Sequence, residues 1–564
     1  RADAGRLERE IPNSAPRSEK KRLWAAQDRA EDLAREGTRL LAEANASLDA
    51  ALANAPDHAG ARRLLAELHW DRHVEAEAAG DRRGVILHLR QAERWNDGAL
   101  DARLRGEGTV TLRTRRWTCD CLSRGRAVAP ESLNVFGYHP WSGRRLSGEP
   151  VESVPALETG PPPRLRVHAH DCPRIEAPNA SVWAWRCEEI DRVLIPVSAR
   201  EGGAPCPPAL LDRLFGDSPY RPRGQGLHLG ETPIVGRALP RGSWLLVVSA
   251  PGCAPSRVPL VVRRLEESTA EVTVFGADDV PAGFLPVAGG PFFSQGDPGN
   301  PASGPAAVVD LPDVFIAQFP VTCADYLAFL IDLARTAPAE ATARVPRKGQ
   351  DGPAYWPQVS PGAWAIPDPA WLAGAPDDLR RQASRLDGAT ADWLRSWPVL
   401  GVSWSDASAY ARWRSLRDGR LYSLVHEDAW EKAGRGVDAR AFPWGETFDP
   451  CLCNAYGSHR EGYFPVPVRD CPFDESPWGI RGLAGNSWDW CLNDPGLTHP
   501  GFRIGKGGSF TQAPPRNRMS HSGVNHLHAA FFTNGIRLAA ACALTPPGET
   551  WYREDRRKRP APRA

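Results

Sequence analysis

Apolar and polar residues alternate at helical spacing through the first hundred positions of the chain. Apolar side chains recur three or four residues apart, among them Leu23, Ala26, Ala30 and Leu33. The segment is also rich in Ala, Leu, Glu and Arg, which favour helix. The pattern predicts a long helix from about Ser18, a second from Pro56 or Asp57 to about Ala79, and a third from Arg82 to Trp95. We expect a helical hairpin over residues 17–105, after a flexible lead-in over residues 1–16.

Short apolar runs typical of strands replace this pattern between residues 106 and 276. Seven runs are broken by Pro and Gly: TVTLRT, RLRVHAH, SVWAWRC, DRVLIPV, SWLLVVSA, RVPLVVRR and AEVTVF. The stretch Leu229–Val262 resembles a small β-sandwich module that carries G-x-T-P before a strand ending at an apolar-Pro-Gly turn. Such modules are spacers or binding surfaces, so we expect a β-sandwich spacer over residues 106–276.

The last part of the chain combines both kinds of pattern, which gives the chain an α, then β, then α+β order. We expect a domain over residues 280–545, with a Pro- and Trp-rich insertion at 336–396, and a basic, Pro-rich tail over residues 546–564. The helical hairpin resembles one tetratricopeptide unit, which buries its core only against a neighbour. Predicted core residues are Trp404, Trp413, Trp430, Trp444, Trp488, Trp490 and Ile536.

Charge and hydropathy exclude several classes of partner. The 69 basic and 68 acidic residues leave a net charge of +1, so no global charge points to nucleic acid or an anionic membrane. No apolar run reaches the roughly 18 residues of a membrane helix, and no signal peptide is visible. These features predict a soluble, cytoplasmic protein. Because the chain begins at Arg1 and holds one Met, we also expect it to continue a longer N-terminal part.

The twelve cysteines are spread along the chain without the dense spacing of a disulfide framework. Two pairs, Cys119 with Cys121 and Cys451 with Cys453, have one-residue gaps instead of the C-x-x-C of most zinc sites. We therefore predict reduced thiols without a bound metal.

Two stretches near the C-terminus are rich in Gly, and the first also contains Trp478, Trp488 and Trp490. Trp478–Trp490 reads WGIRGLAGNSWDW, and Gly505–Ala540 begins GKGGSF and closes on NGIRLAA. Gly allows the backbone to approach closely, while Trp488 and Trp490 each bury a large apolar area. We expect these stretches to form the compact core of a loop-rich domain.

These motifs resemble the formylglycine-generating enzyme family, also called the sulfatase-modifying-factor domain. In that family G-L-x-D-M-x-G-N-V-W-E-W, R-G-G-S-W/F and N-x-G-F-R-x-A follow in this order. Further blocks agree in family order: Phe284–Asp297, Phe315–Leu330, residues 397–436 and FPWGE at Phe442–Glu446. The resemblance implies a C-type-lectin-type fold over residues 280–545.

The resemblance implies copper chemistry that this sequence does not support. Active members bind copper through two cysteines just after GGS, and these would fall at Gln512 and Asn517. No cysteine occurs between Cys491 and Cys542, and a neutral amide does not replace a thiolate as a soft ligand for Cu(I). We therefore predict no formylglycine synthesis and no catalytic residues. An active formylglycine-type oxidase is the alternative.

Calcium is the cofactor that the resemblance implies, at two places. The implied ligands are Asn454, Ala455 and Glu461 at the first place, and Gly485, Ser487 and Asp489 at the second. Each place departs from the family at one ligand position, and calcium takes six to eight oxygens. The alternative is that Asn454 and Asp489 cap turns through hydrogen bonds.

The residues after GGSF form the predicted ligand-binding groove, because this region holds the substrate peptide in active relatives. Here it is polar and basic, with Ser509, Gln512, Arg516, Asn517, Arg518, His521, Asn525, His526 and His528. Such a groove suits a peptide, an acidic group or a metal, and a solvated surface is the alternative. The same fold serves elsewhere as a C-type-lectin-like binding platform.

A second site hypothesis lies in the helical part. His69, His73 and Glu75 stand in an H-x3-H-x-E arrangement, which puts both histidines on one helix face. The arrangement resembles the iron motif of the ergothioneine-type sulfoxide synthases. The resemblance implies non-haem iron at His69 and His73, with His88 as the nearby third ligand. The alternative is that both histidines pack inside a helical repeat.

Leu64–Thr114 is similar to the segment after the kinase domain in bacterial Ser/Thr protein kinases that end in a sulfatase-modifying-factor domain. The sequence itself contains none of the kinase motifs, so the resemblance implies a kinase domain in the parent protein. We predict an inactive sulfatase-modifying-factor-like module that acts as a sensor or binds a protein or peptide in a kinase-linked signalling protein. A non-haem iron oxygenase is the alternative.

Overall fold

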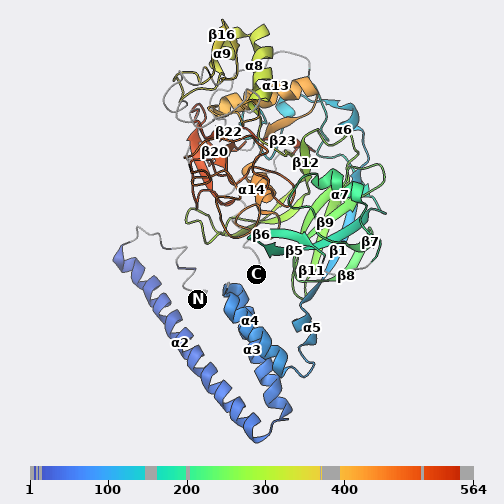
Figure 1. Ribbon diagram of the computed structural model, residues 1–564, viewed down its shortest axis with the longest axis vertical. Helices are drawn as coiled ribbons and strands as arrows, with labels where there is room; N and C mark the ends of the chain where they lie inside the picture. Colours follow the sequence, from blue (N-terminus) through green and yellow to red (C-terminus); the bar gives the residue numbers. More distant parts are fainter. Residues whose placement is uncertain are drawn as a thin grey trace. The chain divides into compact units, whose positions relative to one another are not determined.

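The computed structural model describes residues 6–7, 11, 16–79, 81–146, 162–198, 203–368, 370, 394–460, 462–496 and 501–546. The chain divides into two compact units, one up to Glu107 and a larger one from Gly108 onward. The ribbon shows helices in the first unit and a mixture of strands and helices in the second (Figure 1).

The first unit contains the helices α2 (Arg17–Asn54), α3 (Ala59–Ala79), α4 (Arg82–Trp95) and α5 (Asp101–Arg105). The third predicted helix has the expected bounds because the Asp81 carboxylate caps it, accepting from the Arg83 and Gly84 amides at 3.1 Å. The second begins at Ala59, slightly later than predicted. α3 and α4 pack side by side on a small core of Ala66, Trp70, Ala92 and Leu100.

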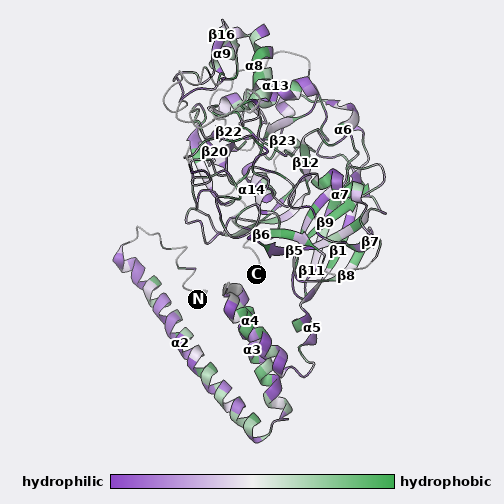
Figure 2. Ribbon diagram, viewed as in Figure 1, coloured by the Kyte–Doolittle hydropathy of each residue, from purple (hydrophilic) through white to green (hydrophobic). Residues whose placement is uncertain are grey.

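The long helix α2 differs from this pair. Leu52 is the one buried side chain among its residues, and hydrophilic residues make up much of its length (Figure 2). The pairing of α3 with α4 agrees with the predicted hairpin, while its tetratricopeptide-like character stays a prediction.

Two sheets form the first part of the larger unit. One has the order β11-β1-β4, with β8 on β1, and the other has the order β10-β9-β5-β6, with β7 on β5. Their strands are β1 (Glu107–Trp117), β4 (Arg174–Glu176), β5 (Ser181–Ile190), β6 (Val193–Val197), β7 (Leu227–Glu231), β8 (Ile234–Pro240), β9 (Gly242–Ser249), β10 (Ser256–Val262) and β11 (Glu267–Thr273). Alternating apolar residues of both sheets meet in one core that includes Leu112, Val182, Leu246 and Val272.

One predicted strand of this region forms only in part. RLRVHAH gives the two-residue strand β3 (Arg164–Leu165), paired with β2 (Arg126–Ala127), and then single bridges at Arg166 and His168. The bridges lead to Arg420 and Ala543 of the C-terminal part, so this run pairs outside its own region. The short helices are α6 (Cys121–Arg124), a 3-10 turn at Pro130–Ser132, and α7 (Pro208–Phe215).

The C-terminal part holds two four-stranded sheets, ordered β12-β15-β23-β18 and β21-β20-β19-β22. Its strands are β12 (Phe284–Val287), β13 (Gly290–Ser294), β14 (Ala307–Leu311), β15 (Val314–Ala317), β18 (Tyr422–Leu424), β19 (Trp488–Trp490), β20 (Phe502–Lys506), β21 (Ser522–His526), β22 (Asn534–Gly535) and β23 (Leu538–Ala541). Its helices include α8 (Cys323–Thr336), α13 (Trp404–Asp418) and α14 (Glu427–Arg435). Thr322 and Ser403 begin α8 and α13 with capping boxes.

The predicted core of this domain is buried with one exception. Trp404, Trp430, Trp444, Trp488, Trp490 and Ile536 are all buried. Trp413 is only partly buried. Its indole donates to the Asp332 carboxylate of α8 at 2.8 Å, and this contact is exposed to solvent. The tryptophans of the GNSWDW and FPWGE motifs therefore form the core that their spacing predicted.

The strand-rich region is joined to the C-terminal domain by buried polar contacts. The Glu475 carboxylate, fully buried, accepts from Arg257 of β10 at 2.6 Å and from Ser218 at 2.7 Å. The amide of Leu194 in β6 donates to the Trp444 carbonyl at 2.8 Å. These contacts tie the strand-rich region to the C-terminal domain, and both belong to the same compact unit.

The insertion after α8 folds onto the domain over its described residues. It contains α9 (Pro338–Ala343), β16 (Gln358–Ser360) and β17 (Ala363–Trp364). Arg344 and Arg347 pair with the buried Asp406 of α13 at 3.4 and 2.9 Å. Residues 371–393 of the insertion, most of the lead-in, and 547–564 of the predicted tail lie outside the described residues.

None of the twelve cysteines forms a disulfide. Within the part of the chain that the structure describes, no helix combines the length and apolar character needed to cross a bilayer.

Candidate functional site

The GNSWDW motif lies at the centre of the β21-β20-β19-β22 sheet. Trp488 begins β19, and two glycines, one on the adjacent strand β20 and one on β21 beyond it, leave room for its indole ring. A Cβ at Gly505 would lie 2.9 Å from this ring, and one at Gly523 would lie 2.1 Å from it. Both positions therefore require glycine, and Trp488 fills the space above the two strands.

The next residue, Asp489, binds two partners from other motifs. Its Oδ2 accepts from Arg537 Nε at 2.6 Å and from Trp430 Nε1 at 2.8 Å. The remaining nitrogens of Arg537 donate to carbonyl oxygens of Ala317, Gln318, Arg481 and Gly482. NGIRLAA thus supplies the cation that holds the GLAGNSWDW turn in place.

Gln512 and Asn517, where active relatives carry their cysteines, are bound within the protein. The Gln512 side-chain oxygen accepts from the Trp488 indole and from the Ser509 amide, the latter at 3.2 Å. Asn517 is fully buried, and its Nδ2 donates to the Ala484 carbonyl at 2.8 Å. The Asn517 Oδ1 has no hydrogen-bond partner. Neither side chain offers the thiolate that Cu(I) requires, so the copper site of active relatives does not fit these residues.

The other predicted groove residues divide into two sets. Ser509 contacts Gln512 through its backbone amide. The His521 ring meets the edge of Trp488 at 6.2 Å between ring centroids, and the Trp488 indole in turn donates to Gln512. Burial, together with Lys506 and Arg516, lowers the pKa of His521 to about 4, so its imidazole is neutral at pH 7.

Arg518, Asn525 and His526 do not join that set. Arg518 turns towards Asp297 and forms two contacts of 2.7 Å with its carboxylate. Asn525 and His526 lie on β21 and pair with β20. Arg516 is exposed on the loop between the two sets.

Exposed aromatic residues border Gln512, a feature that the sequence pattern alone did not single out. The Tyr456 amide donates to the Gln512 carbonyl at 2.8 Å. The rings of Tyr456 and Tyr463, 59% and 44% exposed, lie 6.2 Å apart. Tyr463 also stacks near the buried Phe510, at 6.5 Å. An apolar surface with hydroxyl groups thus lies beside Gln512, one of the two positions where active relatives carry cysteine. We call Tyr456 and Tyr463 the tyrosine pair.

At the first implied calcium place, Asn454 is bound to protein atoms. Its Nδ2 donates to Phe464 O at 2.9 Å and to Asn486 Oδ1 at 3.0 Å, and its Oδ1 lies 3.1 Å from His459 Nε2. The Ala455 carbonyl accepts from the Ser458 amide at 3.1 Å. A calcium ion would have to displace these partners. The third implied ligand, Glu461, lies outside the described residues.

At the second place, the carboxylate already faces a positive charge. Asp489 pairs with Arg537 at 2.6 Å, and the Gly485 carbonyl accepts from the Ser487 amide at 2.8 Å. Arg537 supplies the cation that calcium would otherwise bring to Asp489. At both places the described ligand residues are hydrogen-bonded to protein atoms, and calcium at either place stays a prediction.

The two helical histidines are oriented differently from each other. His73 is fully buried, with Nδ1 at 3.0 Å from the Val85 carbonyl and Nε2 at 3.1 Å from Glu77. His69 lies against His88, with their Nδ1 atoms 3.2 Å apart. Because both nitrogens of His73 have protein partners, an iron ion there would have to replace one of them.

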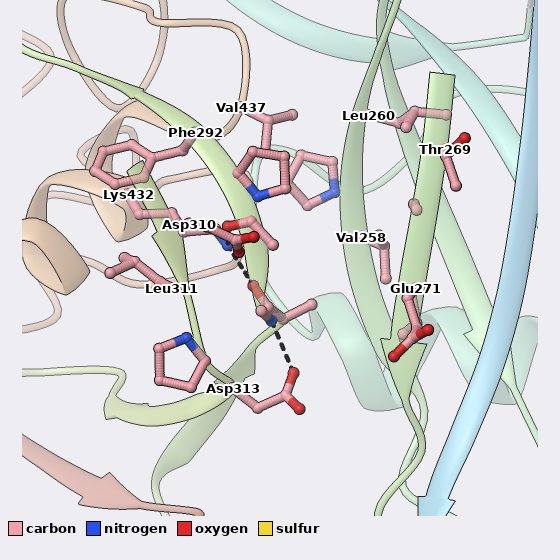
Figure 3. A pocket seen from close by; sticks show the side chains of 18 of the residues that line it. Val258, Leu260, Thr269, Glu271, Phe292, Asp310, Leu311, Asp313, Lys432 and Val437 are labelled. Atoms are coloured by element: carbon pink, nitrogen blue, oxygen red, sulfur yellow. Dashed lines mark hydrogen bonds between the residues drawn. The ribbon is translucent and has the colours of Figure 1, made fainter. Parts of the chain in front are cut away.

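A cavity of about 770 Å³ lies between β10 and β11 on one side and the β13–β14 hairpin on the other. Its walls include Val258, Leu260, Phe292 and Leu311, with Glu271, Asp310 and Lys432 at the polar positions (Figure 3).

Lys432 projects from α14 and donates to the Ala288 and Gly290 carbonyls at 2.6 and 2.8 Å. Burial lowers the pKa of this ammonium group to about 8. No sequence motif pointed to this cavity, because its walls come from segments far apart in the chain.

Comparison with known proteins supports the class of domain. Residues 273–542 match the family model of the sulfatase-modifying factor enzyme 1-like domain. The chain is 29% identical over 264 residues to hercynine oxygenase of Mycolicibacterium smegmatis, covering 42% of this chain and 54% of that protein. It is 28% identical over 298 residues to formylglycine-generating enzyme of Thermomonospora curvata, covering 48% of this chain and 90% of that one.

Two further similarities complete the comparison. The inactive C-alpha-formylglycine-generating enzyme 2 of Bos taurus is 31% identical over 167 residues, which covers 27% of this chain and 53% of that protein. The structure of PvdO from Pseudomonas aeruginosa aligns with 46% of this chain and 94% of its own at 19% identity and a TM-score of 0.34. The chain spans about half the length of the hercynine oxygenase and of the Bos taurus protein.

The fold and the motifs together define a domain with the architecture of formylglycine-generating enzymes. Residues 273–542 of this chain match the sulfatase-modifying factor enzyme 1-like domain, and the resemblance drawn from its Gly- and Trp-rich motifs is confirmed at this level. Its relatives include active enzymes and a protein named as inactive, so activity has to be argued from the site.

Proposed function

We propose that the sulfatase-modifying-factor domain binds a peptide or protein partner and does not oxidise cysteine. The observation that carries the proposal is the bonding of Gln512 and Asn517. Both amides are tied to neighbouring groups of the domain, and Asn517 is fully buried. Oxygen activation on copper in this family rests on two thiolates, and the altered positions hold none.

The tyrosine pair gives the same surface a means of recognition. Tyrosine side chains provide apolar contact area and a hydroxyl at a small cost in conformational entropy, and they are enriched at sites that dominate protein binding. Tyr456 is linked directly to the Gln512 carbonyl, so a peptide lying on the tyrosine pair would also pass the altered catalytic positions.

Peptide display tests the binding. A random peptide library is selected against the full chain, and the affinities of enriched peptides are measured for wild type and for the Tyr456→Ala/Tyr463→Ala variant. We expect a loss of roughly tenfold or more in the variant, because two exposed aromatic contacts are removed. Leu416→Ala, at a 48% exposed position of α13, is the matched control and should bind as wild type does. Equal affinity in the double variant would remove the tyrosine pair from the proposal.

A separate assay addresses oxidation. The protein is loaded with Cu(I), mixed with a sulfatase-type cysteine peptide in air, and followed by mass spectrometry. No formylglycine product is expected from the wild type, whereas turnover by the wild type would overturn the proposal and restore the oxidase alternative. Gln512→Cys/Asn517→Cys provides the comparison, since it returns thiols to both positions and should raise copper affinity.

The iron oxygenase alternative rests on similarity to hercynine oxygenase. The contacts of His73 with Val85 and Glu77 weigh against it. Iron analysis of the purified chain tests it, since a stoichiometric metal that is lost in His73→Ala would support this alternative over the binding module.

We also propose that the module works in a cytoplasmic, kinase-linked signalling protein. The support is the sequence similarity of Leu64–Thr114 to the segment that follows the kinase domain in such proteins. The gene sequence upstream of the codon for Arg1 tests this context: a kinase domain there would support it, and any other domain would refute it.

A further inference from the structure

Four side chains that commonly bind metals converge just after the end of β1. They are Cys119, Cys121, His168 and Cys172, and one ligand atom of each lies within 4.8 Å of the other three. The Sγ of Cys119 is 2.9 Å from His168 Nδ1, and the Sγ atoms of Cys121 and Cys172 are 3.8 Å apart. Among the residues that the structure describes, this is the one group of three or more such side chains brought together in this way.

Backbone hydrogen bonds assemble the cluster from two segments. The Thr118 amide donates to the Pro173 carbonyl at 3.2 Å, which places the C-x-C segment beside Cys172. The Cys172 amide donates to the Ala169 carbonyl at 3.2 Å, and this turn brings Cys172 back towards His168. The ligand positions are therefore fixed by the fold and do not depend on contacts among the thiols.

His168 is the most constrained member of the cluster. It is 1% exposed, its ring stacks on Trp117 at 4.1 Å, and its Nδ1 faces Cys119. The other ring nitrogen, Nε2, is buried without a hydrogen-bond partner. Nδ1 is therefore the ring nitrogen that faces the cysteine sulfurs, and a metal bound there would leave the ring proton on Nε2.

We propose that Cys119, Cys121, His168 and Cys172 bind one zinc ion. Three cysteines and one histidine are a common ligand set of structural zinc sites. With Zn–S bonds of about 2.3 Å, two thiolates on one tetrahedral ion lie about 3.8 Å apart, and Cys121 and Cys172 have this spacing. The Cys119 Sγ and His168 Nδ1 would separate by roughly half an ångström to admit the ion.

The ligand set defines the kind of zinc site. All four tetrahedral positions are filled by protein atoms, which leaves no position for water or substrate, so the site is structural and not catalytic. On binding, the three thiols lose their protons to solvent and the imidazole binds in its neutral form. No redox step is involved.

The position of the site indicates what the ion stabilises. The His168 amide donates to the Cys542 carbonyl, and the His168 carbonyl accepts from the Leu544 amide, both at 2.9 Å. Zinc would therefore fix the end of β1 to the segment that follows β23, the last strand of the sulfatase-modifying-factor domain. This role is independent of the proposed peptide binding.

Metal analysis of the full chain tests the proposal. The protein is produced in zinc-supplemented medium, purified without chelator and measured by inductively coupled plasma mass spectrometry. We expect about one zinc per chain in the wild type and less than about a tenth of that in Cys119→Ser and in Cys172→Ser. Cys451→Ser is the matched control, because Cys451 and Cys453 have the same C-x-C spacing but are not part of a group of ligands.

A second measurement uses the wild type alone, so it remains decisive if the variants do not fold. Removing zinc with a chelator should lower Tm by several degrees, and zinc but not magnesium should restore it. Cobalt(II) in place of zinc should give the absorption of a tetrahedral thiolate site. Three results would overturn the proposal: wild type purified with almost no zinc, unchanged zinc content in both Ser variants, or a Cys121–Cys172 disulfide in the purified protein.

Discussion

Arg537 and Asp489 form a fully buried ion pair in which Arg537 Nε donates to Asp489 Oδ2 at 2.6 Å. The two residues belong to the closing NGIRLAA motif and to the GNSWDW motif, which lie about fifty positions apart in the sequence. The Asp489 Oδ1 has no hydrogen-bond partner, so the charge of this carboxylate depends on Arg537 and on the Trp430 indole. The two motifs also pair through the backbone of β19 and β22, and Arg537 adds the buried charge that this junction requires.

Arg537→Met should therefore destabilise the domain strongly. The substitution keeps the side-chain volume but leaves the Asp489 carboxylate buried without its cation, and it frees four carbonyl groups. Breaking a buried pair from one side typically costs about 3–5 kcal/mol. Urea unfolding followed by tryptophan fluorescence measures the loss.

The control for this variant is Arg113→Met. Arg113 pairs with Glu176 at 2.9 Å, and both side chains are nearly half exposed, so its loss should cost no more than about 1 kcal/mol. Equal effects of the two substitutions would show that the buried pair does not stabilise the junction of the motifs.

Gly523→Ala should disturb the site through Trp488. The new Cβ would lie 2.1 Å from the Trp488 ring, so the indole must move and its hydrogen bond to Gln512 is strained. We expect a loss of roughly 1–3 kcal/mol, a shift in tryptophan fluorescence, and weaker binding of the selected peptides. Gly304→Ala is the control, since its nearest neighbour would be 3.8 Å away. Unchanged fluorescence in Gly523→Ala would contradict the proposed position of Trp488.

The elements that the sequence predicted well have local causes. Asp81 caps α4 through its own side chain, and the predicted bounds of that helix agree with the structure. The tryptophans of GNSWDW and FPWGE were recognised as core because short motifs with Gly and Trp leave few other ways to bury so large a side chain. Trp413 was predicted as core too, but its indole donates to Asp332 at the edge of the helix pair.

Features that depend on distant partners were not predictable in the same way. Glu475 is a buried carboxylate because Arg257, more than two hundred positions earlier, reaches it. The C-x-C of Cys119 and Cys121 gave no reason to expect metal, since His168 and Cys172 join it only through the turn beside Pro173. Gly523 likewise gives no sign in the sequence that it faces Trp488.

Lowering the pH from 6.5 towards 4 should destabilise the larger unit through protonation of a buried histidine, His139. Burial is the main cause that lowers the pKa of His139 to about 4, from 6.5, and its Nδ1 accepts from the Ser142 amide at 3.2 Å. The folded state therefore binds this proton less readily than the unfolded state. The stabilising contribution is complete above pH 6.5 and is lost as pH falls towards 4, by roughly 2 kcal/mol at pH 5.

The measurement is the dependence of Tm on pH for wild type and His139→Gln. The amide oxygen of Gln can still accept from the Ser142 amide but does not titrate, so the variant should lose less stability between pH 7 and pH 5. His526→Gln replaces an exposed histidine of β21 and should leave the wild-type slope unchanged. A slope that is the same in all three proteins would show that His139 does not carry the acid sensitivity.

Residues 273–546 should not form a stable domain without residues 108–272. Cutting the chain there removes Arg257 and Ser218 from the buried Glu475 carboxylate and leaves it with Arg481 at 2.7 Å. It also removes β10, which lines the cavity opposite the β13–β14 hairpin. Because a buried carboxylate that loses one of its two cations and an exposed apolar wall are both unfavourable, we expect the shorter fragment to be insoluble or rapidly proteolysed. Residues 108–546 should instead unfold in one cooperative calorimetric transition, and a soluble 273–546 fragment with the same Tm would show that the strand-rich region is an independent spacer.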